Sequence, residues 1–200
     1  MPETRRREAV GAILVHALAR LRVTLGFVFG AAVLTIAQPT ARSLAAGLGI
    51  AAIGEAIRIW AAGHLNKSRE VTSSGPYRFV AHPLYVGSTI MAAGLAVACA
   101  SVPVAVLIAL YIGTTITAAI KSEEAFLRRT FGDQYDLYKR GVAERRRTGV
   151  RRRFSLQQAL ANREHRALLG FAVAALLLVL KATYNGVFWR AGGTPVGPGG

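Results

Sequence analysis

Two polar segments of the sequence carry side chains that could bind a charged small molecule. The first contains the run His82-Pro83-Leu84-Tyr85, and the second begins with the acidic pair Glu123-Glu124. A carboxylate can pair with a cation through a charge-assisted hydrogen bond. An imidazole offers a hydrogen-bond donor, and a tyrosine ring offers a flat apolar wall. These residue types predict a binding site, provided that the fold brings the two segments together.

The apolar run between the two segments predicts a pair of membrane-spanning helices. The 42 residues from Phe79 to Ile120 include no Asp, Glu, Lys or Arg. As one helix they would reach about 63 Å, whereas a bilayer core is only about 30 Å thick. We therefore expect a helical hairpin with spans Pro83–Ala100 and Pro103–Ile120, since a proline suits the first turn of a helix. An antiparallel hairpin would place both polar segments at one membrane surface.

Three further apolar stretches complete the predicted architecture. They are Val23–Ala41, with apolar character extending back to Val10, then Ala45–Ala62 and Ala167–Trp189. The sequence therefore predicts an all-α, polytopic integral membrane protein with about five transmembrane helices. A cleaved signal peptide is the alternative for the first stretch, but the apolar region is longer than such peptides require. Within the second stretch, Glu55 and Arg58 are three residues apart, which favours an internal ion pair over a polar cavity lining.

Composition and charge exclude several classes of protein. Apolar residues make up 52% of the chain and charged residues 18%, so the chain is not expected to be disordered. The net charge of +15 alone would suggest nucleic acid, but the apolar excess favours a membrane. The Arg-rich stretch within 143–166 is expected to lie against anionic lipid headgroups rather than nucleic acid. One cysteine, Cys99, supplies too few ligands for a disulfide framework or a four-ligand zinc site.

The distribution of Lys and Arg predicts the orientation in the membrane. The N-terminus carries three, Gly63–His82 carries three, and Lys121–Arg166 carries thirteen, all on one side of a five-span arrangement. The opposite side offers only Arg42 and Arg190. Cytoplasmic loops are enriched in these residues. The N-terminus and the basic loop are therefore predicted to be cytoplasmic.

The two polar segments also resemble a known superfamily. The run from Gly75 to Gly87, Gly-Pro-Tyr-Arg-Phe-Val-Ala-His-Pro-Leu-Tyr-Val-Gly, is followed about forty residues later by Glu-Glu-Ala-Phe-Leu and Phe-Gly-Asp-Gln-Tyr. Both motifs are similar to those of the isoprenylcysteine carboxyl methyltransferase and phospholipid methyltransferase superfamily. The resemblance covers roughly 67–142 and implies an integral-membrane enzyme that uses S-adenosylmethionine. It also implies a lipophilic methyl acceptor, either a phospholipid amine or an isoprenylcysteine-like carboxylate.

The resemblance implies a set of cofactor-binding residues. They are Val71, Thr72, Tyr77, His82, Pro83, Leu84, Tyr85, Gly87, Glu123 and Glu124. Glu123 is the expected partner of the cofactor's ammonium group, and no residue is singled out as a catalytic base. No metal is expected, because methyl transfer from a sulfonium needs none. The whole chain is expected to be one domain, with a motif-bearing core (67–142), a basic segment (143–166), a last span (167–189) and a tail (190–200).

The chain departs from the superfamily pattern at two positions. Ala81 stands where members commonly have Arg before His-Pro. Ala119 stands where the isoprenylcysteine enzymes place an Arg that contacts the substrate. These departures weigh against an isoprenylcysteine substrate. Three other classes of function stay open: a sterol-reductase-like enzyme that uses reduced nicotinamide, a membrane scaffold without activity, and a small transporter.

Overall fold

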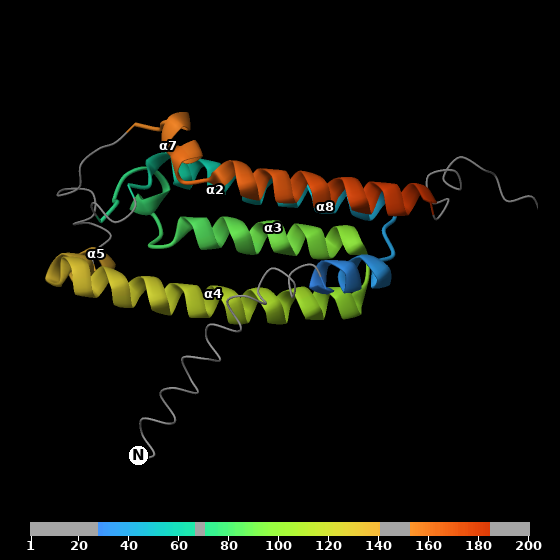
Figure 1. Ribbon diagram of the computed structural model, residues 1–200, viewed down its shortest axis with the longest axis horizontal. Helices are drawn as coiled ribbons and strands as arrows, with labels where there is room; N and C mark the ends of the chain where they lie inside the picture. Colours follow the sequence, from blue (N-terminus) through green and yellow to red (C-terminus); the bar gives the residue numbers. More distant parts are fainter. Residues whose placement is uncertain (1–27, 67–70, 141–152, 185–200) are drawn as a thin grey trace, which may run out of the picture. The chain divides into compact units, whose positions relative to one another are not determined.

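The computed structural model describes residues 28–66, 71–140 and 153–184 (Figure 1). All regular structure in these ranges is helical, which confirms the predicted all-α class. Residues 28–36 form a helix in a first compact unit, Met1–Ile36. The second unit, Ala37–Gly200, holds every other element and is described by itself. Its elements are α2 (Ala41–His64), η1 (Gly75–Arg78), α3 (Pro83–Cys99), α4 (Val102–Phe131), α5 (Asp133–Arg140), α7 (Leu156–Ala161) and α8 (Glu164–Tyr184).

Several of these helices have the length and hydropathy of membrane spans. Within the described ranges, α2, α4 and α8 are each long and apolar enough to cross a bilayer. The apolar helix α3 has 17 residues, which corresponds to about 26 Å, close to the thickness of a bilayer core. The protein is therefore a polytopic membrane protein. The part of the first predicted span before residue 28, including its extension back to Val10, lies outside the described ranges.

The boundary between the first predicted span and α2 differs from the prediction. The helix over 28–36 ends before Pro39, and Ala41 belongs to α2 rather than to the first span. Proline disfavours a helical conformation in the residue before it. Thr40 and Ser43 then form a reciprocal cap, in which each side-chain oxygen accepts a hydrogen bond from the other residue's backbone N–H, at 3.0 and 2.9 Å.

The predicted helical hairpin is confirmed, but its second helix is longer than expected. Ala100 adopts a left-handed conformation (φ 47°) and ends α3, and α4 begins at Val102. The predicted end of the second span at Ile120 was wrong as a helix boundary, because α4 continues to Phe131. Between Ile120 and Gly132 the chain has no proline or glycine, and Gly132, with a φ of 51°, ends the helix. The last turns of α4 thus extend Glu123 and Glu124 on a rigid helix beyond the apolar run.

Helices α2 and α3 pack with their backbones in close approach. A Cβ atom added at Gly47 would lie 2.3 Å from the backbone N of Ala98, and one at Gly94 would lie 2.3 Å from that of Ala51. Closer to the site, Gly54 and Gly87 face each other in the same way. Small residues at such crossings are typical of membrane helix pairs. This contact fixes the axial position of the residues at the start of α3.

Substituting Gly94 tests the importance of this contact. We expect Gly94→Ala to destabilise the protein by about 1–3 kcal/mol, because the new methyl group would overlap backbone atoms of α2. The matched control is Gly49→Ala on α2, where an added Cβ meets nothing within 4 Å. Unfolding in mixed micelles should show a lower midpoint for the first variant only. Equal midpoints for the two variants would mean that the packing tolerates a methyl group.

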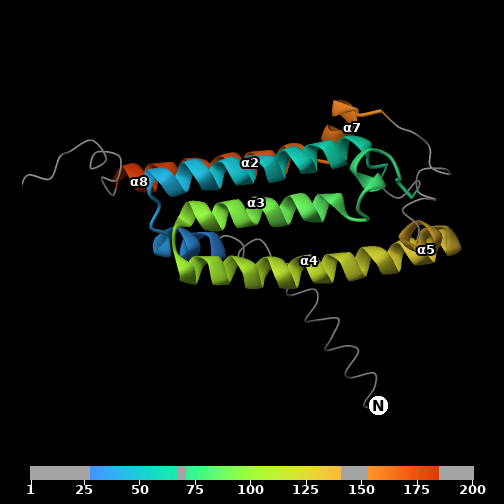
Figure 2. The same ribbon diagram turned by 180° about the vertical axis from the view of Figure 1, so that it is seen from behind.

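The end of α2 is held by the short helix α7, which the sequence analysis did not predict. The Asn162 side chain donates hydrogen bonds of 2.8 Å to the backbone oxygens of Ala62 and Leu65, and Gln158 donates one of 2.8 Å to Leu65. These bonds satisfy carbonyl groups that a helix end leaves without partners. Helix α8 follows α7 and packs on α2 (Figure 2). Helix α3 contacts α2 and also contacts α4.

Candidate functional site

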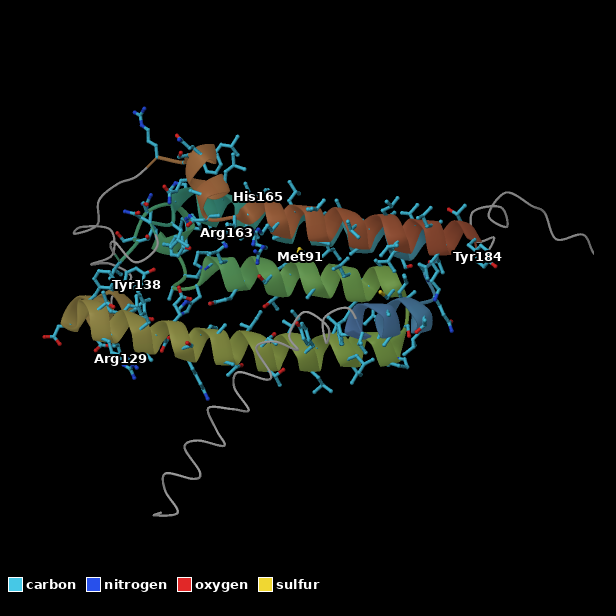
Figure 3. The ribbon with its side chains drawn as sticks, viewed as in Figure 1. Met91, Arg129, Tyr138, Arg163, His165 and Tyr184 are labelled. Carbon is cyan, nitrogen blue, oxygen red and sulfur yellow. The ribbon has the colours of Figure 1, made fainter. Side chains whose placement is uncertain are left out.

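The predicted site residues gather at one end of the helices in this unit. Here α2 ends, η1 precedes α3, α4 ends and α8 begins; we call this the site end. Figure 3 shows Tyr138, Arg163 and His165 at the site end and Tyr184 at the opposite end. The predicted proximity of the two polar segments is confirmed by the contact between His82 and Glu124, at 3.3 Å. Within the described ranges, no group of three or more His, Cys, Asp or Glu side chains could hold a metal ion.

His82 connects the two segments. It is the residue before α3, and its ring lies between the two adjacent glutamates of α4. The Nε2 atom is 3.3 Å from Oε1 of Glu124, and the Nδ1 atom is 3.8 Å from Oε2 of Glu123. The ring also contacts the Tyr85 ring, with centroids 5.7 Å apart. The imidazole thus contacts both carboxylates and a neighbouring aromatic ring.

Glu124 forms ion pairs with two basic side chains at the site end. Lys139 on α5 donates hydrogen bonds of 2.7 Å to each of its carboxylate oxygens. Arg128, one turn further along α4, lies 3.9 Å away. This carboxylate is charge-balanced within the protein and joins α3, α4 and α5. Its role as a direct cofactor ligand stays a prediction.

Glu123 has fewer partners than Glu124. Its side chain is 38% exposed, and its ion-pair contact with His82 is long at 3.8 Å. The phenol of Tyr85 is near enough to interact with it electrostatically. Because Lys139 and Arg128 neutralise the neighbouring carboxylate instead, negative charge remains at Glu123. This side chain is the best placed in the described site to pair with a cationic ligand.

Tyr77 is the buried aromatic residue of the site and interacts electrostatically with Glu123. It lies in η1, where Gly75 adopts a left-handed φ of 57° and Pro76 starts the turn. Tyr77 is buried, and its backbone oxygen accepts a hydrogen bond of 3.1 Å from the Tyr138 hydroxyl. Burial, reinforced by the nearby Glu123 carboxylate, raises the pKa of the Tyr77 phenol well above its usual value. This phenol therefore stays neutral and can act as a hydrogen-bond donor at physiological pH.

The other predicted site residues have mainly structural surroundings. Thr72 is buried, and its hydroxyl accepts a hydrogen bond of 3.2 Å from the backbone N–H of Asn66. Pro83 is buried at the first turn of α3, Leu84 is half-buried in the same turn, and Val71 is half-buried in the preceding loop. Gly87 faces α2, since a Cβ atom there would lie 2.7 Å from the Gly54 carbonyl oxygen. The structure thus brings together Tyr77, His82, Tyr85, Glu123 and Glu124, and turns Gly87 toward α2.

Sequence reasoning gave no site role to two residues that contact the site, Tyr138 and Lys139. Both lie on α5 after the Gly132 break. Their contacts with Tyr77 and Glu124 depend on the direction in which α5 leaves α4. Burial also raises the pKa of their neighbour Tyr135 to about 12, with a contribution from Glu124. The polar and aromatic composition of α5 was visible in the sequence, but no spacing rule indicated these partners.

A buried charge cluster also links α2, α3 and α8. Arg58 lies 3.4 Å from Glu55 on its own helix, which confirms the predicted ion pair. It also lies 2.7 Å from Glu164 at the start of α8 and donates a hydrogen bond to the Ser88 hydroxyl. Glu55 and Glu164 are only 2% and 7% exposed. The Arg58 cluster, defined as these four residues, therefore ties the last helix to the helices that carry the site.

Comparisons with known proteins show what the chain is similar to. Residues 25–134, more than half of the chain, match the family described as phospholipid methyltransferase. A stretch of 96 residues is 34% identical to the nickel-cobalt-cadmium resistance protein NccN of Alcaligenes xylosoxydans xylosoxydans, covering 47% of this chain and 43% of that protein. A stretch of 77 residues is 34% identical to protein-S-isoprenylcysteine O-methyltransferase of Schizosaccharomyces pombe, covering 38% of this chain and 33% of that protein. The chain thus matches less than half the length of these relatives, and no solved structure matches it significantly.

Proposed function

Because the chain belongs to the phospholipid methyltransferase family, we propose that it transfers a methyl group from S-adenosylmethionine to the amine of a phospholipid. The observation that carries this proposal is the half-exposed carboxylate of Glu123. It lies beside an imidazole and two tyrosines at the end of an apolar helical hairpin. A polar cofactor can reach this place from water, while a lipid reaches it from the bilayer.

The residues at the site end suit the chemical groups of this cofactor. Its ammonium and sulfonium groups are positive, which matches the negative charge that remains at Glu123. Its adenine requires a flat apolar surface, which Tyr77 and Tyr85 can supply. Its carboxylate requires donors, which His82 and the backbone N–H groups at the start of α3 can provide. These roles follow from side-chain chemistry and from the observed proximity of the residues.

The protein's contribution to methyl transfer would be mainly positional. When bound, S-adenosylmethionine supplies an electrophilic methyl group on a positively charged sulfur. The site residues would hold the acceptor nitrogen, the methyl carbon and the sulfur in line, a type of contribution that can exceed several kcal/mol. The amine must reach the site unprotonated or lose its proton to water or a base. Of the two adjacent carboxylates, Glu123 is the more exposed, at 38% against 15% for Glu124.

A product assay tests the proposed function directly. The purified protein in native membrane lipids, given methyl-labelled cofactor, should place label in the organic phase after extraction. Product chemistry then separates the acceptors, since an N-methyl group survives mild alkali whereas a methyl ester is hydrolysed. Consumption of reduced nicotinamide would indicate the sterol-reductase-like alternative instead. Label confined to water-soluble small molecules would contradict a lipid acceptor.

We further propose that the site end faces the cytoplasm. The described basic residues at this end are Arg78, Lys121, Arg128, Arg129, Lys139, Arg153, Arg163 and Arg166. The opposite end of the same helices carries Arg42 and Lys181. The excess of basic residues on one side is typical of the cytoplasmic face. The N-terminus and most of the Arg-rich stretch lie outside the described residues, so their cytoplasmic location and headgroup contacts stay predictions.

Cysteine labelling tests this orientation. The single native cysteine, Cys99, is buried and should give little background. A cysteine introduced at the exposed position Gln157 on α7 should react with a membrane-impermeant maleimide only after the cells are permeabilised. Val102, which is 77% exposed at the opposite end, is the control position and should be labelled in intact cells. The reverse pattern would show that the site end faces outward.

A further inference from the structure

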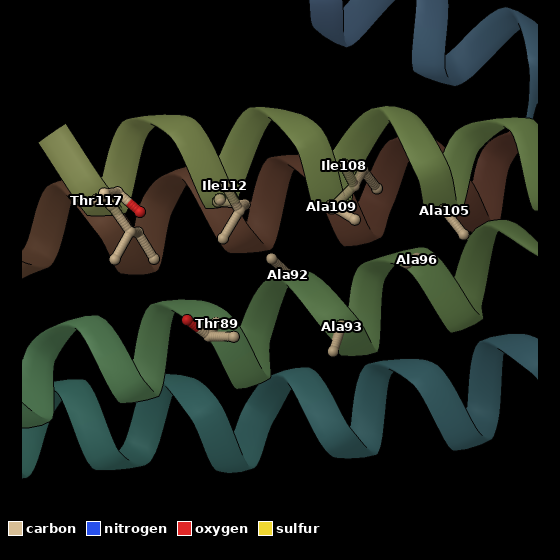
Figure 4. Close-up of a pocket in the computed structure, with 11 residues that line it drawn as sticks. Thr89, Ala92, Ala93, Ala96, Ala105, Ile108, Ala109, Ile112 and Thr117 are labelled. Carbon is tan, nitrogen blue, oxygen red and sulfur yellow. The ribbon is translucent and has the colours of Figure 1, made fainter.

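A groove between α3 and α4 leads away from the site along the apolar hairpin (Figure 4). It has a volume of about 470 Å³. Its lining residues are Thr89, Ala92, Ala93 and Ala96 on α3, and Ala105, Ile108, Ala109, Ile112, Gly113, Ile116 and Thr117 on α4. All but the two threonines are apolar, and the Thr89 hydroxyl donates a hydrogen bond of 2.9 Å to its own helix. The groove therefore suits a hydrocarbon.

The small side chains of α3 are divided between two faces. Gly87 and Gly94 face α2 in close backbone packing, as described above. Ala92, Ala93 and Ala96 instead face α4, where side chains of one carbon leave the groove open. On α4 itself, Val104 is buried, whereas the rest of the helix is half-buried or exposed. The groove is thus a consequence of which residues of α3 and α4 are small.

The size of the groove corresponds to one lipid chain. From Ala105 to Thr117 the groove follows α4 for about 18 Å, close to the roughly 15 Å of one leaflet of a bilayer core. A cavity of about 150 Å³ accommodates benzene, with six carbons. By that proportion, about 470 Å³ accommodates one chain of roughly eighteen carbons. Two chains of that length would not fit together.

The groove is aligned with the proposed site. Thr89 lies one turn after Tyr85 on α3. Glu123 lies seven residues after Ile116 on α4, which places both on the same face because seven residues make nearly two turns. A chain in the groove would end with its polar head beside Glu123 and His82. The threonine end of the groove is the end nearest the site, and its other end lies toward the turn between α3 and α4 (Figure 4).

We propose that this groove holds one acyl chain of the methyl acceptor, a phospholipid of the leaflet on the site side, and so places its amine in the site. The inference rests on the proposed function. The surroundings of an acyl chain are as apolar in the bilayer as in the groove, so transfer of the chain into the groove contributes little hydrophobic binding free energy. Its contribution is to position the headgroup and to select acceptors by chain length. The second acyl chain stays in the bilayer.

Filling the groove should change this selection. Ala109→Phe places a large ring midway along the groove, while Ala118→Phe adds the same ring at an exposed position of α4 outside it. We expect Ala109→Phe to lower kcat/KM for palmitoyl phosphatidylethanolamine about tenfold or more, since misplacing a reacting group has effects of this order. Its kcat/KM for the hexanoyl analogue and its affinity for S-adenosylmethionine should match the parent. Ala118→Phe should leave all three quantities unchanged.

The outcomes separate this inference from the proposed function. An unchanged palmitoyl-to-hexanoyl ratio in Ala109→Phe overturns the groove assignment while methylation itself stands. A parent protein that binds no S-adenosylmethionine and methylates neither lipid refutes the proposed function and this inference together. A third outcome concerns the occupant of the groove. If an isoprenyl compound inhibits the parent but not Ala109→Phe, while kcat/KM for the palmitoyl lipid is the same in both, the groove binds an isoprenyl chain and the choice of an acyl chain is overturned.

Cross-linking on the unmodified protein provides a test that does not depend on folding of the variant. A phosphatidylethanolamine with a photoreactive group at the end of its palmitoyl chain should label the far end of the groove, near Ala96 and Ala105. Excess unlabelled palmitoyl lipid should suppress this labelling more than excess hexanoyl lipid. Labelling confined to α8 or to the outer face of α4 around Ala118 would overturn the proposal.

Discussion

Replacing Glu123 with glutamine is expected to weaken binding of S-adenosylmethionine by about 1.5–3 kcal/mol, the range for hydrogen bonds to charged groups. This corresponds to roughly a 10- to 150-fold increase in Kd. The substitution keeps the shape of the side chain and removes the negative charge that Lys139 and Arg128 leave unbalanced. Titration calorimetry on the purified protein in detergent measures the effect. The melting temperature without cofactor should change little, because this half-exposed side chain makes few contacts.

Asp133→Asn is the matched control for the Glu123 substitution. It also removes one carboxylate near the site end, from an exposed position at the start of α5. An equal loss of affinity in both variants would indicate a general effect of net charge rather than a contact. An unchanged Kd in Glu123→Gln would refute the assignment of the ammonium partner. Neither result would alter the family to which the chain belongs.

Replacing Arg58 with methionine is expected to destabilise the protein by about 3–5 kcal/mol, the range for removing one partner of a buried ion pair. Arg58 is 2.7 Å from Glu164 and 3.4 Å from Glu55, and both carboxylates are almost completely buried. Without the guanidinium they would remain as uncompensated charges in a membrane-spanning region. Unfolding in a detergent titration should report this loss. Activity should fall in parallel, because the cluster fixes α8 and the start of α3 relative to α2.

Two comparisons isolate the charge effect. Arg42→Met removes an arginine from an exposed position of the same helix and should change stability by no more than about 0.5 kcal/mol. Adding Glu55→Gln and Glu164→Gln to Arg58→Met should restore part of the lost stability, because the unpaired charges are then gone. If Arg58→Met is no more destabilising than Arg42→Met, the cluster does not hold the helices together. If the neutral triple variant shows no recovery, lost packing rather than charge explains the effect.

Much of the helical framework could be predicted from local features of the sequence. The uncharged run from Phe79 to Ile120 was too long for one span, and the hairpin followed from that length. The error at the end of α4 arose because hydropathy marks where a helix leaves the bilayer, whereas the helix itself continues until Gly132. The ion pair between Glu55 and Arg58 could be predicted because both lie on one helix, three residues apart.

By itself, then, the sequence determined the helical class, the hairpin, the family resemblance and the meeting of two polar motifs at one end. Only the tertiary structure distinguished the adjacent residues Glu123 and Glu124, which point about 100° apart on a helix and so meet different neighbours. It placed Lys139 against Glu124 and Glu164 against Arg58. It also divided the small residues of α3 between the contact with α2 and the open groove. These choices depend on helix rotation and on the direction of a turn, which hydropathy and residue spacing do not encode.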